Sequence, residues 1–112
     1  MKRSCALLLL LSVLLLACSH EPDVKISVTM KKYSIEPAEI HVKRGQRVEL
    51  TVSTLDVQHG FSVPDLGIKE PVQKNKPAVI TFTADHAGQY VVQCAIICGS
   101  GHDDMRARIV VE

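Results

Sequence analysis

The sequence lacks the features that are typical of nucleic-acid-binding proteins, of nucleotide-binding proteins and of hydrolases with a catalytic serine. Its 13 basic and 12 acidic side chains nearly cancel, leaving a formal charge of +1. Nucleic-acid binding requires a basic patch, and nothing in the sequence suggests one. A phosphate-cradling glycine loop is absent, as is a Ser/His/Asp arrangement for nucleophilic catalysis. We therefore expect no nucleic-acid partner and no chemistry of these kinds.

Long apolar runs are also missing. The longest covers residues 6–17 and is interrupted only by Ser12. A run of twelve residues is too short to span a bilayer, but it suits the core of a signal peptide. Lys2 and Arg3 precede it, as the positive start of a signal peptide requires.

The apolar run ends in Leu15-Leu16-Ala17-Cys18, which resembles the lipobox of bacterial lipoproteins. The resemblance implies that residues 1–17 are a cleaved lipoprotein signal peptide and that Cys18 is acylated, which anchors the chain to a membrane. Residues 18–23 are then the lipidated cysteine and a short tether. The alternative is an ordinary secretory signal with an incidental cysteine.

Beyond the tether, apolar and polar residues alternate in short runs. Such period-2 alternation predicts half-buried strands. Prolines predict connections rather than strands in two segments: Pro71 and Pro77 in residues 64–77, and Pro37 in residues 33–37. With no helical period in any stretch, we expect an all-β Greek-key sandwich or barrel over residues 24–112. Its seven predicted strands lie near residues 24–30, 40–43, 47–52, 59–63, 80–82, 90–94 and 107–111.

Two thiols, an imidazole and a thioether fall within twelve residues. They are Cys94, Cys98, His102 and Met105, spaced C-x3-C-x3-H-x2-M. Soft and borderline ligands of this kind select copper over magnesium or calcium. Given the two cysteines, composition alone puts a His and a Met at set positions about once in a thousand cases. The alternative is a Cys94–Cys98 disulfide in an exported protein, which leaves His102 and Met105 unexplained.

The other histidines are unequal candidates. His20 lies in the tether, His41 on the solvent side of a predicted strand and His86 in a predicted turn. His59 opens a predicted strand, and a single histidine there is more often a hydrogen-bonded loop residue than a ligand. Whether His59 is a ligand depends on its relation to the segment that contains Cys94 and Cys98. Met30 continues the apolar face of its strand and is expected in the core.

These features together resemble the cupredoxins and, within them, the dinuclear copper (CuA) domain of cytochrome c oxidase subunit II. The resemblance covers residues 24–112 and is most specific at residues 63–69, 88–90 and 93–105. It implies that Cys94 and Cys98 bridge two copper ions and that His59 and His102 each bind one of them. Met105 and the main-chain oxygen of Ile96 are then weak ligands.

Three features depart from that family. Subunit II usually has Glu at the position of Ile96, where the carboxylate helps to bind magnesium against subunit I. Subunit II also has a pair of transmembrane helices, whereas a lipid anchor is expected here in their place. It often uses an aromatic residue near the site for electron entry, whereas this chain has no Trp. The departures bear on membership in a standard oxidase complex and leave the copper ligands in place.

The resemblance implies a membrane-anchored electron carrier on the periplasmic, or extracytoplasmic, side of a bacterial membrane. Its redox partner is expected to be a c-type cytochrome or a haem–copper oxidase subunit, and any oxidase activity would belong to a larger complex. Asp103 and Asp104 could steer a basic cytochrome or be plain solvated charges. Two other functions stay open: copper storage, delivery or sensing with the same ligands, and a structural sandwich with a disulfide and no metal.

Overall fold

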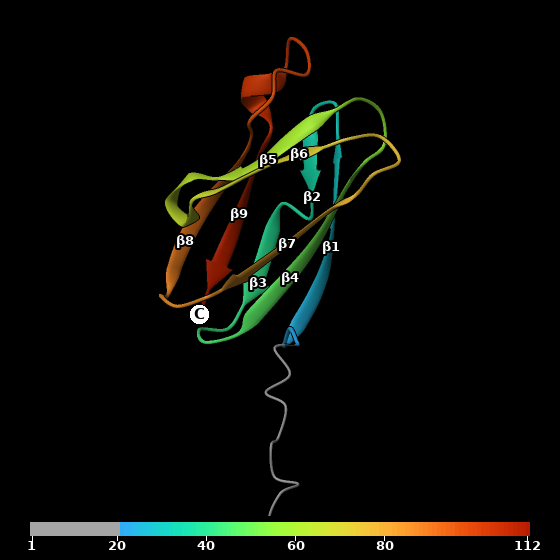
Figure 1. Cartoon of the computed structure of the whole chain (residues 1–112). Helices are drawn as coiled ribbons and strands as arrows, with labels where there is room; N and C mark the ends of the chain where they lie inside the picture. The colour runs from blue at the N-terminus through green and yellow to red at the C-terminus, as the bar shows by residue number, and fades with distance from the viewer. Residues whose placement is uncertain (1–20) are drawn as a thin grey trace, which may run out of the picture.

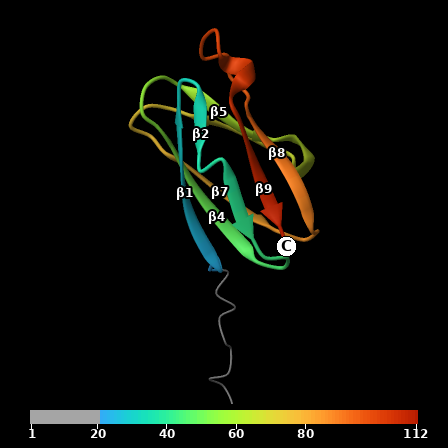
Figure 2. The ribbon, with the colours of Figure 1, turned by 180° about the vertical axis from the view of Figure 1, so that it is seen from behind.

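A computed structural model describes residues 21–112, so the predicted signal peptide and Cys18 lie outside the described residues. In this part of the chain, nine strands form two sheets that enclose a shared core (Figures 1 and 2). Two short 3-10 helices complete it, η1 (Pro64–Leu66) and η2 (His102–Asp104). The prediction of an all-β sandwich is confirmed.

The strands divide into a four-stranded and a five-stranded sheet. The first has the order β2-β1-β4-β7, with β1 and β4 parallel, and the second has the order β3-β9-β8-β5-β6, with β3 and β9 parallel. The chain therefore crosses repeatedly between the sheets. The bounds are β1 Val24–Lys31, β2 Ser34–Glu36, β3 Glu39–Val42, β4 Arg47–Thr54, β5 His59–Val63, β6 Ile68–Val72, β7 Ala78–Thr83, β8 Gly88–Cys94 and β9 Arg106–Val111.

Alternating side chains build the core. In β4, Val48, Leu50 and Val52 are fully buried, while the residues between them face outward. Successive side chains of a strand point to opposite faces, so each sheet contributes one apolar face to the interior. Met30 is fully buried on β1, which confirms its place in the core.

Two strands lie where the sequence predicted only connections, and that prediction was wrong. β2 falls within residues 33–37 and β6 within residues 64–77. Both lie at the edge of a sheet, where proline is tolerated because one side of the strand has no hydrogen-bonding partner. Pro71 of β6 accordingly stands opposite Gly60 of β5.

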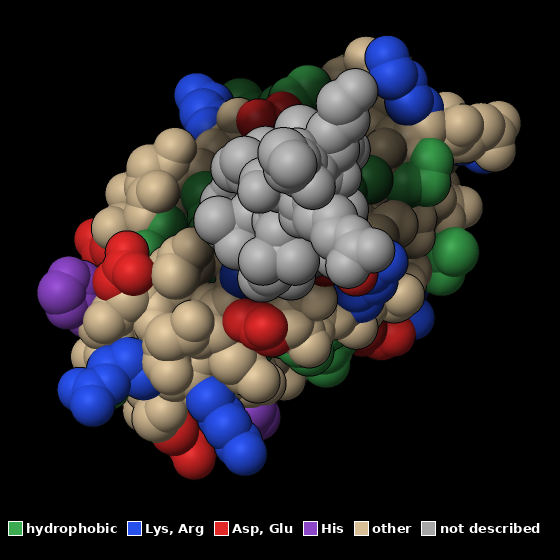
Figure 3. All heavy atoms as spheres, turned by 60° about the horizontal axis from the view of Figure 1, so that its bottom comes forward, with side chains coloured by type: hydrophobic (Ala, Val, Ile, Leu, Met, Phe, Trp, Pro, Cys, Tyr) green, Lys and Arg blue, Asp and Glu red, His purple; other side chains and the backbone are tan. Residues whose placement is uncertain are grey.

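The two ends of the sandwich differ in character. The β8–β9 loop, which contains η2, projects from the top of the molecule in Figure 1, whereas β1 begins and β9 ends near the bottom. Basic and acidic side chains intermingle over the visible part of the bottom face (Figure 3). Among residues 21–112, no helix has the length and apolar character needed to cross a membrane.

The lower end carries one ionic cluster that links β3 to the end of the described chain. His41 is exposed, as predicted, and its ring nitrogens lie 3.1 Å from carboxylate oxygens of Glu112 and Glu39. The hydrogen bond to Glu112 raises the pKa of His41, and that to Glu39 adds to the effect. The protonated imidazole therefore favours the folded state.

We predict that His41→Gln removes a pH-dependent part of the stability. Because the folded pKa of His41 is raised, its contribution is fully present below the unfolded value of about 6.5 and is lost as the pH rises through the folded pKa. Urea unfolding of wild type and variant near pH 5.5 and pH 8.5 measures this. The wild type should be the more stable at the lower pH, and the difference should shrink at the higher one. An equal difference at both pH values would contradict the prediction.

Candidate metal centre

The six predicted ligand residues converge at the top of the sandwich. His59 is the first residue of β5, and Cys94 is the last residue of β8. Cys98 and His102 lie in the β8–β9 loop, and Met105 directly precedes β9. Gln93 and Arg106 form the last pair of the β8–β9 ladder, so both ends of the loop are fixed by the sheet.

The potential ligand atoms lie close to one another. One ligand atom each from His59, Cys94 and Cys98 all lie within 4.8 Å of one another. The two Sγ atoms are 3.9 Å apart, with His59 Nδ1 3.8 Å from Cys94 Sγ and His102 Nδ1 3.8 Å from Cys98 Sγ. Met105 Sδ lies 3.4 Å from Cys98 Sγ, and the Ile96 carbonyl oxygen lies 3.1 Å from Cys94 Sγ.

The site is buried on one side and open on the other. His59 is 0% exposed, Met105 1% and Cys94 6%, whereas Cys98 and His102 are half-buried. Both cysteines are free thiols. Burial raises the pKa of the Cys98 thiol, and the neighbouring Cys94 raises it further. Metal binding at this pair therefore has to displace thiol protons.

Asp56 orients His59. Its Oδ1 lies 2.9 Å from His59 Nε2, so a carboxylate there accepts the Nε2 proton and leaves the Nδ1 lone pair facing Cys94. The backbone N–H of Lys32 holds the pKa of Asp56 well below its usual range, and Val57 N–H and His59 contribute. Asp56 was not predicted from the sequence, although an Asp three positions before a candidate His is a signal for such a role.

Gly60 lets the ligand loop lie directly on β5. A Cβ at this position would come within 2.9 Å of the Ile96 side chain and 3.0 Å of its backbone nitrogen. The Ala95 N–H donates to the Gly60 carbonyl oxygen at 2.8 Å, which pins the start of the loop beside His59. The contact joins the two halves of the site, which are distant in sequence.

Tyr33 supports the outer part of the loop. Its ring lies against Gly99 and Gly101, and a Cβ at either glycine would overlap it. Its hydroxyl lies 3.5 Å from Ser100 Oγ. Tyr33 follows β1, so a different hairpin holds the segment between Cys98 and His102. Nothing in the sequence indicated this role, because the two segments are more than sixty residues apart.

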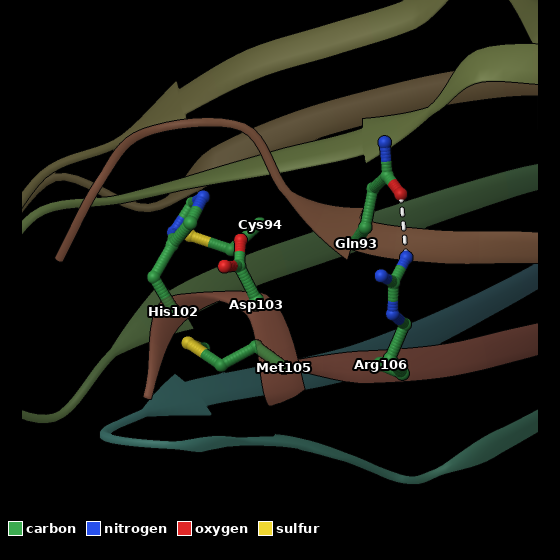
Figure 4. Close-up of a pocket in the computed structure, with 6 residues that line it drawn as sticks. All are labelled: Gln93, Cys94, His102, Asp103, Met105 and Arg106. Carbon is green, nitrogen blue, oxygen red and sulfur yellow. Dashed lines mark hydrogen bonds between the residues drawn. The ribbon is translucent and has the colours of Figure 1, made fainter. Parts of the chain in front are cut away.

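The arrangement fits a soft metal. With zinc as a guide, metal–sulfur bonds are about 2.3 Å and metal–nitrogen bonds about 2.0 Å, so donors on one ion lie less than about 4.6 Å apart. The thiol–thiol and thiol–imidazole distances of 3.9 and 3.8 Å satisfy this limit. Figure 4 shows the side chains of Cys94, His102 and Met105 directed toward a common region. Thiolate, imidazole and thioether are donors that copper accepts.

We predict that Tyr33→Ala loosens the ligand loop and speeds copper release. Outer residues that hold ligands in place commonly affect metal affinity by about 10- to 100-fold, and we expect the lower end of that range. Tyr33→Phe keeps the ring against Gly99 and Gly101 and should release copper at nearly the wild-type rate. The measurement is the rate of copper transfer to an excess of a coloured chelator.

Tyr90 supplies a matched control. Its hydroxyl donates to the His86 carbonyl oxygen at 2.7 Å, in the turn before β8 and away from the ligand loop. Tyr90→Ala should lower the stability of the sandwich with little change in copper release. If Tyr33→Phe released copper as fast as Tyr33→Ala, support by the ring would be ruled out.

The chain is similar to known proteins in sequence and in fold. Residues 4–111 match the family model of the cupredoxin-like domain. Cytochrome c oxidase subunit 2 of Thermostichus vulcanus is 32% identical over 99 residues, which cover 80% of this chain and 30% of that protein. Nitrous-oxide reductase of Cupriavidus necator is 30% identical over 93 residues, which cover 80% of this chain and 14% of that protein. The chain thus spans less than a third of the length of these relatives.

Solved structures share the fold. The periplasmic domain of subunit II of cytochrome oxidase (CoxB) of Bradyrhizobium japonicum superposes with a TM-score of 0.76 at 22% identity, covering 82% of this chain and 86% of that one. The metal-binding domain of the Streptococcus pneumoniae Cu(I)-exporting ATPase CopA, solved with Cu(I), gives 0.64 at 24% identity, covering 79% and 84%.

The chain resembles the copper domain of cytochrome c oxidase subunit II, and His59, Cys94 and Cys98 form a group that could hold a metal ion. The family and the soft donors together support copper as that metal. Residues 4–111 match the family model over nearly the whole chain, and this chain therefore belongs to the cupredoxin-like domain family.

Proposed function

We propose that this protein is an electron carrier with a dinuclear copper centre. Cys94 and Cys98 hold both ions as thiolates, and His59 and His102 each bind one through Nδ1. Met105 Sδ and the main-chain oxygen of Ile96 are weak outer ligands. When bound, the copper pair supplies a site that gains and loses one electron at a time.

One observation carries the proposal of two ions. Each thiol has its own imidazole nitrogen at 3.8 Å, His59 beside Cys94 and His102 beside Cys98. With Met105 and the Ile96 carbonyl oxygen, the site offers six donor atoms. A closed tetrahedral site for one ion uses only four. The surplus is accounted for if two ions share the thiol pair.

The surroundings favour electron transfer over bond-making chemistry. His59 and Met105 are buried, which leaves little room for a substrate at the inner side of the site. The sheet fixes both ends of the loop, while Gly60 and Tyr33 hold its middle. Ligands held in this way move little when the charge of the metal changes, and their burial and hydrogen bonds tune its potential.

The relatives support a carrier in the same way. Cytochrome c oxidase subunit 2 and nitrous-oxide reductase are named for different reactions, yet each matches 80% of this chain. The region that the chain shares with both relatives is therefore not specific to either of the two reactions. By itself the chain is not proposed to be an enzyme; any reductase or oxidase activity belongs to a larger complex. Its partners are proposed to be a c-type cytochrome and a haem–copper oxidase subunit.

The position of the site suits a protein anchored by its N-terminus. The described chain begins near the bottom of the sandwich and the ligand loop lies at the top (Figure 1). If Cys18 is acylated on the extracytoplasmic side of a bacterial membrane, the loop faces away from that membrane. Ile97, which is 84% exposed beside Cys98, then lies where a soluble partner can reach it.

Copper delivery is a second candidate function. Cys98 and His102 are half-buried, and a partner could reach both from solvent. Transfer of copper between proteins needs such access, whereas electron transfer does not require the ligands to leave the metal. Copper release that is fast compared with electron exchange would favour delivery.

The test of the proposed function is the electron resonance spectrum of the oxidised, copper-loaded protein. One unpaired electron shared equally between two copper nuclei of spin 3/2 gives seven lines, whereas a single nucleus gives four. We expect two coppers per chain, a seven-line signal and a purple colour. Four lines at one copper per chain would contradict the dinuclear proposal.

Substitution of either thiol extends this test. Cys94→Ser and Cys98→Ser should each abolish the two-copper spectrum, because one thiolate cannot supply both bridges. A one-copper site with the remaining cysteine, His59 and His102 is compatible with the proposal. Ile96→Glu is the matched control, since every side chain at this position keeps the main-chain oxygen, and its spectrum should stay close to that of wild type.

We also predict that Cys18→Ala abolishes membrane anchoring. The substitution removes the sulfur that would be acylated, so the lipoprotein type of cleavage should be lost with it. Membrane fractionation and mass spectrometry of the mature N-terminus measure both effects. An unmodified Cys18, or cleavage at another bond in the wild type, would exclude the lipid anchor.

A further inference from the structure

The buried donors raise the question of how copper reaches them. His59 and Met105 have almost no exposed surface, and Cys94 is 6% exposed. A cavity of about 120 Å³ lies beside them, lined by Gln93, Cys94, His102, Asp103, Met105 and Arg106 (Figure 4). Since a water molecule occupies about 30 Å³ in the liquid, this space has room for an ion that keeps some of its hydration.

The two charged residues of this cavity lie on different parts of its wall. The carboxylate of Asp103 points toward the side where Cys94, His102 and Met105 converge (Figure 4). The guanidinium of Arg106 is turned to Gln93, to which it donates a hydrogen bond of 2.7 Å. A cation in the cavity is therefore attracted on the donor side and repelled on the other.

We propose that this cavity is the route by which copper enters the site and that Asp103 guides the ion toward Cys94. This rests on the proposed copper site. Asp103 is exposed and is not one of the six proposed ligands. Its charge acts on the approach of the ion, while the final centre is set by the thiols, imidazoles and weak ligands.

Asp104 offers a control within the same loop. It is exposed like Asp103 and carries the same charge, but it does not line the cavity. Asp103→Asn and Asp104→Asn therefore change the net charge equally and differ only in where the charge is lost. Arg106→Gln removes the positive charge from the wall and should act in the opposite direction.

The experiment follows copper uptake by the full chain, reduced and free of metal, in the absence of oxygen. The probe is Cu(I) supplied as its acetonitrile complex, and stopped flow records the thiolate–copper absorbance. For a monovalent ion about 6 Å from a carboxylate in water, the Coulomb attraction corresponds to about a threefold change in local concentration. We expect Asp103→Asn to slow uptake by about threefold at an ionic strength of about 0.01 M, and the effect to vanish near 1 M salt.

The remaining variants complete the expected pattern. Asp104→Asn should slow uptake clearly less than Asp103→Asn does, because Asp104 does not line the cavity. Arg106→Gln should increase the rate, because it removes the positive charge from the wall. The final copper content and the spectrum should be the same in all variants. Equal slowing by Asp103→Asn and Asp104→Asn would overturn the inference, because net charge would then explain the rates.

Two further outcomes separate this inference from the proposed function. A lower final copper content in Asp103→Asn would overturn it by making Asp103 a ligand. If the wild type took up no copper, the proposed function would fail, and this inference with it. If the wild type loaded two coppers and all variants did so at the same rate, only the inference would fail.

Discussion

Strands β8 and β9 pair antiparallel, with Gly88 opposite Val111 at one end and Gln93 opposite Arg106 at the other. The ligand loop between the two strands begins directly after the pair of Gln93 and Arg106. This pairing fixes the separation of the loop's two ends, so Cys94 and Met105 enter the site from defined positions. The loop between them then needs support only in its middle. Its contact with Gly60 on one side and with Tyr33 on the other provides that support.

The same construction explains why the donors are unequal in exposure. Cys94 belongs to a strand and His59 opens the neighbouring one, so the two sheets bury both. Cys98 and His102 belong to the loop and stay half-buried. The site therefore has a buried inner side formed by strands and an outer side that solvent reaches. That division suits an electron carrier, and it leaves the cavity beside Asp103 as a way in.

The features of this fold that have a local signal could be predicted from the sequence, whereas those that depend on distant contacts could not. Period-2 alternation predicted strands such as β1 and β4, because half-buried strands need it. It missed the edge strands β2 and β6, because Pro37 directly after β2 and Pro71 within β6 normally indicate a connection. It also gave no hint of Tyr33, whose role depends on how two hairpins pack.

For this protein, the sequence alone determined that four potential donors, Cys94, Cys98, His102 and Met105, lie within twelve residues, so that a single loop can bring them together. It also determined the fold class, because alternation dictates which faces are buried. Only the tertiary structure decided that His59 lies 3.8 Å from Cys94 and that Asp56 fixes its tautomer. The first of these contacts joins residues 35 positions apart, which the packing of β5 against β8 brings together.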